Sequence, residues 1–128
     1  MRAFLIIFLL VASPHAAAQG LSPMKGEIRT YSHQFAVLLT ASNPYNTAQR
    51  FSVALRDEWG EPAQRVQATV PNFSLPPGES GAFYVWGDVP PSKRILVCVT
   101  SQFFATGAGA PVRGEVCGKF DIVQLTQQ

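Results

Sequence analysis

Residues 94–125 read RILVCVTSQFFATGAGAPVRGEVCGKFDIVQL, two apolar runs joined by a loop of small residues. In each run an apolar residue recurs at every second position, which is typical of a strand with one buried face. A slip of one residue in their pairing would turn every inward side chain to the other face. The pattern therefore predicts one antiparallel register for the strands Arg94–Phe104 and Gly114–Leu125. In it Ile95 faces Phe120, Val97 faces Gly118, Cys98 faces Cys117 and Val99 faces Val116.

The chain has two cysteines, and this register places them directly opposite each other. Opposed residues of an antiparallel pair have Cα atoms about 4.5 to 5.5 Å apart, which is within reach of a disulfide. We therefore expect a Cys98–Cys117 disulfide on the outer face of one sheet. A zinc site is the alternative, but the two cysteines and His33, the one histidine after the first eighteen residues, do not supply four ligands. No metal is expected.

The first eighteen residues have the pattern of a cleavable signal peptide. Arg2 precedes an apolar run, and the small residues Ala16, Ala17 and Ala18 follow it, as a signal peptidase requires. The run is about half the roughly 20 residues that span a bilayer. An uncleaved anchor is the alternative. We expect a signal peptide over residues 1–18 and a periplasmic or extracellular protein, where a disulfide is stable.

Short runs rich in Val, Phe, Leu and Tyr recur along the rest of the chain, separated by Gly, Pro, Asn and Asp. No apolar period of 3.6 residues lasts three turns. Such spacing is typical of a β-sandwich. Residues 19–128 are therefore predicted to form one all-β, immunoglobulin-like sandwich of about seven antiparallel strands. Besides the two strands above, these are Glu27–Tyr31, Gln34–Ser42, Gln49–Asp57, Arg65–Val70 and Gly81–Gly87.

The charged residues argue against several functions. Without Arg2 the chain has nine Lys and Arg against eight Asp and Glu, and no basic cluster, so neither nucleic acid nor anionic lipid is an expected partner. A catalytic triad needs a histidine beside its nucleophile, and His33 lies in a turn. Asp57 and Glu58 are adjacent and do not face each other across a cleft. We expect no enzyme activity and no cofactor.

The segments 41–53 and 70–80 suggest a family. They read ASNPYNTAQRFSV and VPNFSLPPGES, in which Leu75 would enter the core and Gly78 would make a turn. These motifs resemble the N-terminal immunoglobulin-like domain of periplasmic pilus-assembly chaperones, the PapD-like group. Those chaperones have two such domains, and this chain has room for one. The resemblance implies a protein partner whose terminal carboxylate binds two basic residues, near which Arg29 and Lys119 fall. The alternative is that both are solvent-facing strand residues.

Two segments are candidate binding surfaces. The hairpin tip 103–113 carries Phe103 and Phe104 beside small residues and could present an apolar contact. The alternative is that one phenylalanine caps the core. The final strand, with Ile122, Val123 and Leu125, is apolar on both faces, so its edge could accept a strand of another chain. The alternative is that the N-terminal segment covers this edge.

Two tryptophans are candidates of lower rank. Trp59 lies in a turn and could hold a ligand, whereas Trp86 shares a face with Ala82 and Tyr84 and is expected on or beside the core.

Taken together, these features predict an exported, non-enzymatic binding or assembly module of chaperone-like type. The alternatives are a structural subunit of a surface appendage or envelope complex, which would self-associate, and an inhibitor that inserts a loop into an enzyme.

Overall fold

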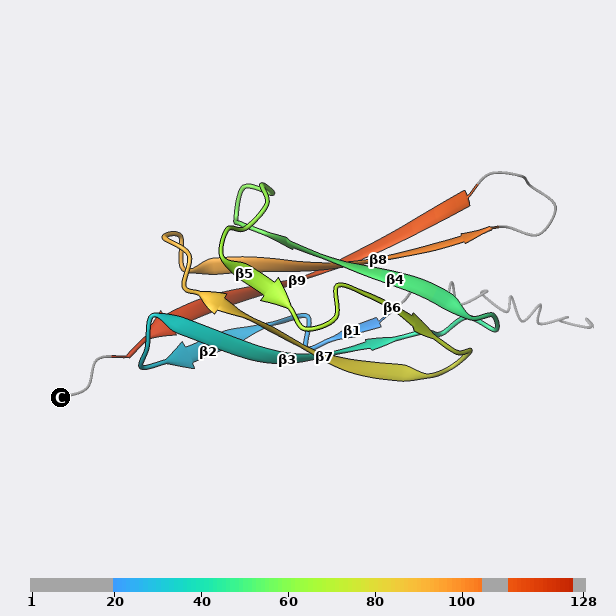
Figure 1. Ribbon diagram of the computed structural model, residues 1–128, viewed down its shortest axis with the longest axis horizontal. Coiled ribbons are helices and arrows are strands. Elements are labelled where there is room, and N and C mark those ends of the chain that lie inside the picture. The colour runs from blue at the N-terminus through green and yellow to red at the C-terminus, as the bar shows by residue number, and fades with distance from the viewer. Residues whose placement is uncertain (1–19, 105–110, 126–128) are drawn as a thin grey trace, which may run out of the picture.

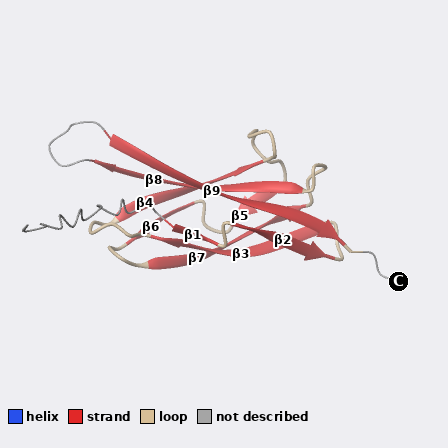
Figure 2. Ribbon diagram, turned by 180° about the vertical axis from the view of Figure 1, so that it is seen from behind, coloured by secondary structure: helices blue, strands red, loops and turns tan. Residues whose placement is uncertain are grey.

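The computed structural model describes residues 20–104 and 111–125, which form two β-sheets packed face to face (Figure 1). Among these residues every regular element is a strand (Figure 2), and none is a helix long and apolar enough to cross a membrane. The four-stranded sheet has the order β1 (Gly20–Ser22), β3 (Gln34–Ser42), β7 (Ser80–Asp88), β5 (Val66–Ala68). The five-stranded sheet has the order β2 (Lys25–Thr30), β9 (Pro111–Gln124), β8 (Arg94–Phe104), β4 (Gln49–Arg56), β6 (Asn72–Leu75). The protein is an immunoglobulin-like β-sandwich, as predicted.

All seven predicted strands are present, with ends that differ by a few residues, and the structure adds two. One is β1, which pairs with β3 in one sheet, whereas β2 pairs with β9 in the other. The other is β6, which follows a crossing from the four-stranded to the five-stranded sheet after β5. Prolines flank β6 on both sides, at positions 71 and 76, so its sequence resembles a loop.

The register predicted for β8 and β9 is confirmed along its whole length. Cys98 is the partner of Cys117, and their Cα atoms lie 4.0 Å apart in a disulfide. Ile95, Val97 and Val99 are fully buried, because they point between the sheets. The disulfide therefore lies on the outer side of the five-stranded sheet.

Aromatic rings fill the core beside β6. The rings of Phe51 and Phe73 stack with centroids 5.5 Å apart, and Phe73 also lies 5.8 Å from Phe83 of the facing sheet. Leu75 is buried and Gly78 has a φ of 71°, so the predicted core contact and turn at this corner are both present. This contact joins the two sheets at one end of the sandwich.

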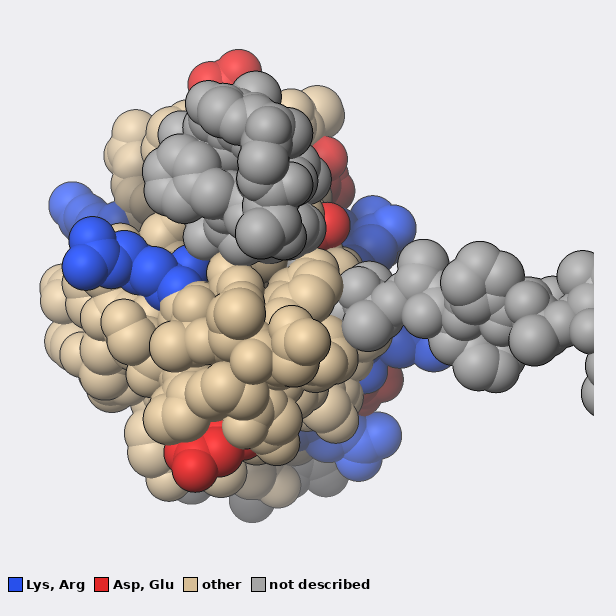
Figure 3. Space-filling view, turned by 90° about the vertical axis from the view of Figure 1, so that its right-hand side faces the viewer, with Lys and Arg blue, Asp and Glu red and all other residues tan. Residues whose placement is uncertain are grey.

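The turn between β3 and β4 is held by one buried side chain, Asn43. Its Nδ2 atom donates to the carbonyl oxygens of Thr47 and Leu75, both at 3.0 Å, and its Oδ1 atom accepts from the backbone N–H of Tyr45 at 3.0 Å. Asn43 thereby ties this turn to the end of β6. Figure 3 looks at this end of the sandwich, where most of the described surface is neither acidic nor basic.

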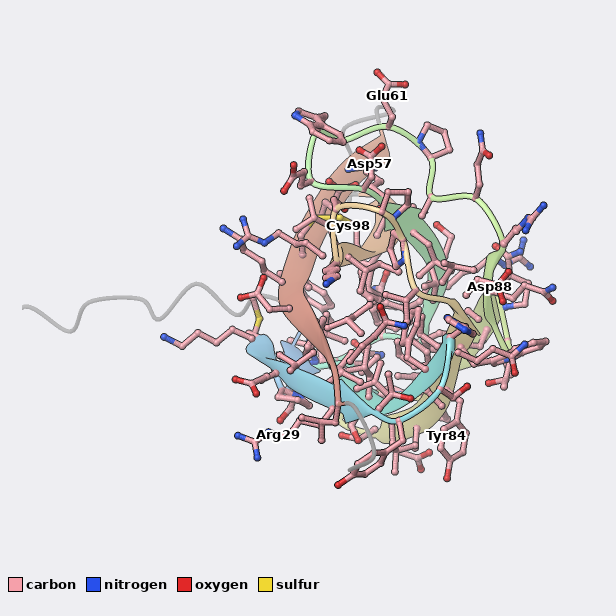
Figure 4. The ribbon with its side chains drawn as sticks, turned by 90° about the vertical axis from the view of Figure 1, so that its left-hand side faces the viewer. Arg29, Asp57, Glu61, Tyr84, Asp88 and Cys98 are labelled. Atoms are coloured by element: carbon pink, nitrogen blue, oxygen red, sulfur yellow. A yellow bond between two sulfur atoms is a disulfide. The ribbon has the colours of Figure 1, made fainter. Side chains whose placement is uncertain are left out.

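The expectation for Trp86 is wrong. The inward residues of β7 are Phe83 and Val85, so the alternate residues Tyr84 and Trp86 face solvent. Tyr84 points away from the sandwich in Figure 4.

Candidate functional site

The strand β9 is longer than the strand that covers its outer edge. It pairs with β8 from Pro111 to Asp121, whereas β2 pairs with it in parallel only from Lys119 to Gln124. In the part of the chain that the structure describes, no strand pairs with the outer edge of β9 before Lys119. An uncovered stretch of edge therefore lies between the covered part of β9 and the hairpin tip.

The backbone groups of this stretch point outward. The N–H of Lys119 donates to the carbonyl of Met24 at 2.8 Å, and the N–H of Leu125 donates to that of Thr30 at 2.7 Å, so odd-numbered residues face β2. By the two-residue period of a strand, Cys117 and Glu115 direct their N–H and C=O groups to the same edge. Such groups are a ready template for an added strand.

The prediction of an unpaired edge at Ile122, Val123 and Leu125 is wrong in its position. Ile122 and Val123 are the register partners of Ile28 and Arg29 in β2, and Ile122 is buried. The N-terminal segment covers this part of β9, which is the alternative that the sequence left open. The edge that lacks a strand lies earlier in β9.

The two basic residues named from the sequence do not come together. Lys119 lies beside Lys25, its register partner, whereas Arg29 pairs with Val123, further along the strands. Arg29 donates to Glu27 at 2.9 Å and points to solvent (Figure 4). Sequence reasoning missed Lys25, because only the parallel pairing of β2 with β9 places it at this position.

Lys25 and Lys119 form a pair of exposed like charges on neighbouring strands. Neither has an ion-pair partner among the described residues. Directly opposed like charges are unfavourable in a sheet unless an anion binds between them. The pair marks the point at which the uncovered edge of β9 ends.

The outer face next to this edge carries the disulfide and an ion pair. Cys98 is fully buried, and the guanidinium Nη1 atom of Arg56 lies 3.6 Å from its sulfur atom. The sulfur atoms and Glu115 lie within 4.8 Å of one another, a spacing that would suit a metal ion, but both sulfurs are joined in the disulfide. This surface is therefore a rigid, polar flank of the edge.

Phe103 and Phe104 end β8, where their register partners are Val112 and Pro111. Their side chains and residues 105–110 lie outside the described part of the chain, so the role of the tip stays a prediction. In Figure 1 the ends of β8 and β9 rise away from the four-stranded sheet. The described residues of β9 that follow the tip, from Pro111 on, thus lead directly into the uncovered edge.

The cleft beside Trp59 is the other concave surface of interest. Trp59 is 74% exposed and lines a cleft of about 740 Å³ between residues 57–65 and 88–92. The carboxylate of Asp57 holds the turn beside this cleft, because its Oδ1 atom accepts hydrogen bonds from the backbone N–H groups of Trp59 and Glu61. His33 lines none of this cleft. The residues described in the cleft thus include neither a histidine base nor a thiol.

No protein-family model matches the chain, and no curated protein matches it either. Several solved structures are similar to the chain. One is a chain in the Salmonella enterica SafA pilin complex with the SafB chaperone, with a TM-score of 0.65 and 17% identity over 84% of this chain and 54% of that one. Another is the E. coli chaperone DraB, with a TM-score of 0.65 and 16% identity over 87% of this chain and 57% of that one.

A third similar structure is a PapD-like domain of human CEP192, with a TM-score of 0.57 and 8% identity. The match covers 100% of this chain and 99% of that one. The chain thus spans little more than half of the first two structures but the whole of a single domain. At these identities the likeness concerns the fold, and the fold of this chain is that of a PapD-like domain.

Proposed function

We propose that the protein is an exported, non-enzymatic, chaperone-like module that holds an extended segment of another protein as an added strand on β9. The observation that carries this proposal is the uncovered outer edge at Glu115 and Cys117, which lies before Lys119, the residue at which pairing with the first residue of β2 begins. Main-chain hydrogen bonds along an edge give affinity without a catalytic group. The similar structures are described as a chaperone and as a chaperone in complex with a pilin, which supports a protein partner.

The basic pair at the end of the edge fits one feature of such a segment, its terminal carboxylate. A strand added parallel to β9 along the uncovered part would have its carboxyl end beside Lys25 and Lys119, and a carboxylate there would relieve the repulsion between the two ammonium groups. We assign the anchoring role to Lys25 and Lys119, and not to Arg29, because Glu27 already neutralises Arg29.

Two observations support the compartment. The disulfide is stable in an oxidising environment outside the cytoplasm. Residues 1–18 have the pattern of a signal peptide, and amino-terminal sequencing of protein from its native host would test cleavage before Gln19. The absence of enzyme activity is likewise part of this proposal, and it is supported by the use of both thiols in the disulfide.

The decisive comparison is between Glu115→Pro and Glu115→Ala. Both variants lose the carboxylate, but only proline removes the N–H that faces the open edge. After crosslinking in intact cells and pull-down, Glu115→Ala should retain its partners, while Glu115→Pro should lose them and remain folded by circular dichroism. Equal recovery with both variants would show that the edge is not the binding surface.

The proposed binding of a terminal carboxylate by Lys25 and Lys119, here called the anchor, is tested separately. The probe is a synthetic apolar peptide that carries either a free C-terminal carboxylate or an amide. Fluorescence anisotropy should show tighter binding of the carboxylate form to the native protein. Lys25→Gln and Lys119→Gln should remove that preference, and Arg29→Gln, the matched control, should keep it. Equal binding of both peptides to the native protein would contradict the anchor while leaving strand addition standing.

A further inference from the structure

The cleft beside Trp59 is separate from the proposed binding edge, because no described residue of β9 lines it. Residues 57–65, which follow β4, form one side of the cleft, and residues 88–92, which lead from β7 to β8, form the other. Figure 4 faces this end of the sandwich and shows Asp57 and Glu61 on the same loop. The volume of about 740 Å³ is within the range of ligand-binding sites, roughly 300 to 1,000 Å³.

The wall of the cleft exposes a tryptophan. Trp59 is 74% exposed, the largest fraction among the large hydrophobic side chains described. Pro62, Pro90 and Pro91 also line the cleft. An indole combines a large apolar surface with a π face that attracts cations, and tryptophan is enriched at binding sites. The cleft therefore offers a ligand an aromatic surface that the core of the protein does not use.

The charges of the cleft are unbalanced. Three acidic residues, Asp57, Glu61 and Asp88, line it, against one basic residue, Arg65. The Nη1 atom of Arg65 lies 3.7 Å from Oδ2 of Asp88, so these two charges offset each other. Asp57 and Glu61 form no ion pair with any described residue. Acidic side chains are common on protein surfaces, but these two lie in one concave site with an exposed indole and leave it with uncompensated negative charge.

We propose that this cleft binds an arginine side chain of another protein. A guanidinium group is planar, so it can stack on the indole of Trp59 and donate parallel hydrogen bonds to a carboxylate such as that of Glu61. An apolar ligand would leave the two carboxylates without a counter-charge, and an anionic ligand would be repelled by them. The charge of the cleft therefore favours a cation. The proposal does not rest on the proposed function, because β9 takes no part in the site.

Each of these contacts is weak at an exposed site, so a single arginine should bind in the millimolar range. Nuclear magnetic resonance suits this range, and the two tryptophans of the chain give separate indole N–H signals, which Trp59→Phe and Trp86→Phe assign. Titration of the native protein with the blocked peptide acetyl-Gly-Arg-Gly-amide should shift the signal of Trp59 in a saturable way. The signal of Trp86, which lies on β7 outside the cleft, should not move.

The need for charge is tested on the ligand and on the protein. A citrulline peptide, which has the shape of the arginine peptide without its charge, should bind about tenfold more weakly. Asp57→Asn and Glu61→Gln should each weaken binding of the arginine peptide about two- to fivefold. Asparagine keeps the oxygen that accepts from the N–H groups of Trp59 and Glu61, so the loop should stay in place. Glu79→Gln, which removes an exposed carboxylate at the other end of β7, is the matched control and should bind as the native protein does.

Three results with these peptides would overturn the proposal. They are the lack of a saturable Trp59 shift with the arginine peptide, equal binding of the arginine and citrulline peptides, and binding that Asp57→Asn and Glu61→Gln leave unchanged. An equal or larger Trp59 shift with the neutral sugar N-acetylglucosamine would also overturn it and assign the cleft to carbohydrate. Glu115→Pro should bind the arginine peptide as the native protein does, which separates this test from that of the β9 edge.

Discussion

Arg56 and Glu115 form a two-pronged ion pair across the disulfide. Nη1 of Arg56 lies 3.1 Å from Oε1 of Glu115 and Nη2 lies 3.3 Å from Oε2, while Nη1 also contacts the sulfur of Cys98. The hydrogen bond from Arg56, with a second from Thr100, lowers the pKa of Glu115. The pair joins β4 to β9 over the intervening strand β8.

This ion pair predicts a pH dependence of stability. The pKa of Glu115 is lower in the folded than in the unfolded protein. The ionised side chain therefore makes its full contribution to the free energy of unfolding above the ordinary glutamate pKa of about 4.3. The contribution is lost as the pH falls through the lowered value. Both side chains are partly exposed, so Arg56→Ala should cost at most about 1 kcal/mol at neutral pH.

The measurement is urea unfolding of native protein and Arg56→Ala at neutral pH and in acid. The free energy of unfolding should differ between the two proteins at neutral pH, and the difference should shrink in acid. Glu115→Gln is the second arm, because it should lose the same pH-dependent contribution. A difference that grows in acid would contradict the assignment.

Removal of the disulfide should lower stability without changing the fold. The two cysteines are separated by 19 positions, and closing a loop of this size stabilises by about 3 kcal/mol in the chain-entropy model. Cys98→Ala with Cys117→Ala should therefore lower the free energy of unfolding by about that amount, measured in denaturant. Circular dichroism should retain the β spectrum, since the apolar register of β8 and β9 remains. Free thiols in oxidised native protein would refute the pairing.

The two glycines that flank the Phe120 ring should respond differently to alanine. A Cβ atom on Gly118 would lie 2.9 Å from Cε2 of Phe120 and 3.2 Å from Cδ2 of Leu21, whereas one on Gly26 would lie 3.7 Å from Cδ1 of Phe120. Gly118→Ala should destabilise by about 1 to 3 kcal/mol through overpacking. Gly26→Ala should change stability by less than about 0.5 kcal/mol. Thermal unfolding of both variants checks this, and equal melting temperatures would contradict the packing.

Asn43 should be the most sensitive residue of the turn between β3 and β4. Its replacement by alanine leaves the buried carbonyl of Leu75 and the N–H of Tyr45 without this partner, at a cost of about 2 kcal/mol or more. Asn46→Ala is the control, since Asn46 lies exposed in the same turn. Denaturant unfolding should separate the two variants clearly. A loss of stability equal to that of Asn46→Ala would show that the Asn43 side chain does not hold the turn.

The amino-acid sequence by itself determined the hairpin of β8 and β9. The inward residues of the two runs match in one register, and a slip would expose all of them. The cysteines fall opposite each other in that register, so the disulfide followed from it. The corner at Leu75 and Gly78 was also predictable, because its prolines and glycine restrict the backbone locally.

The tertiary structure alone decided which part of β9 is covered. β2 shows little alternation, since Ile28 is its single buried residue, and no local turn sets its register. Its partner residues lie far away in the sequence, as Lys25 and Lys119 do, and the pairing is parallel. The position of the open edge and the Lys25–Lys119 pair therefore depend on how the N-terminal segment divides between the two sheets. That division is set by packing between distant segments, which the alternation within a single strand cannot specify.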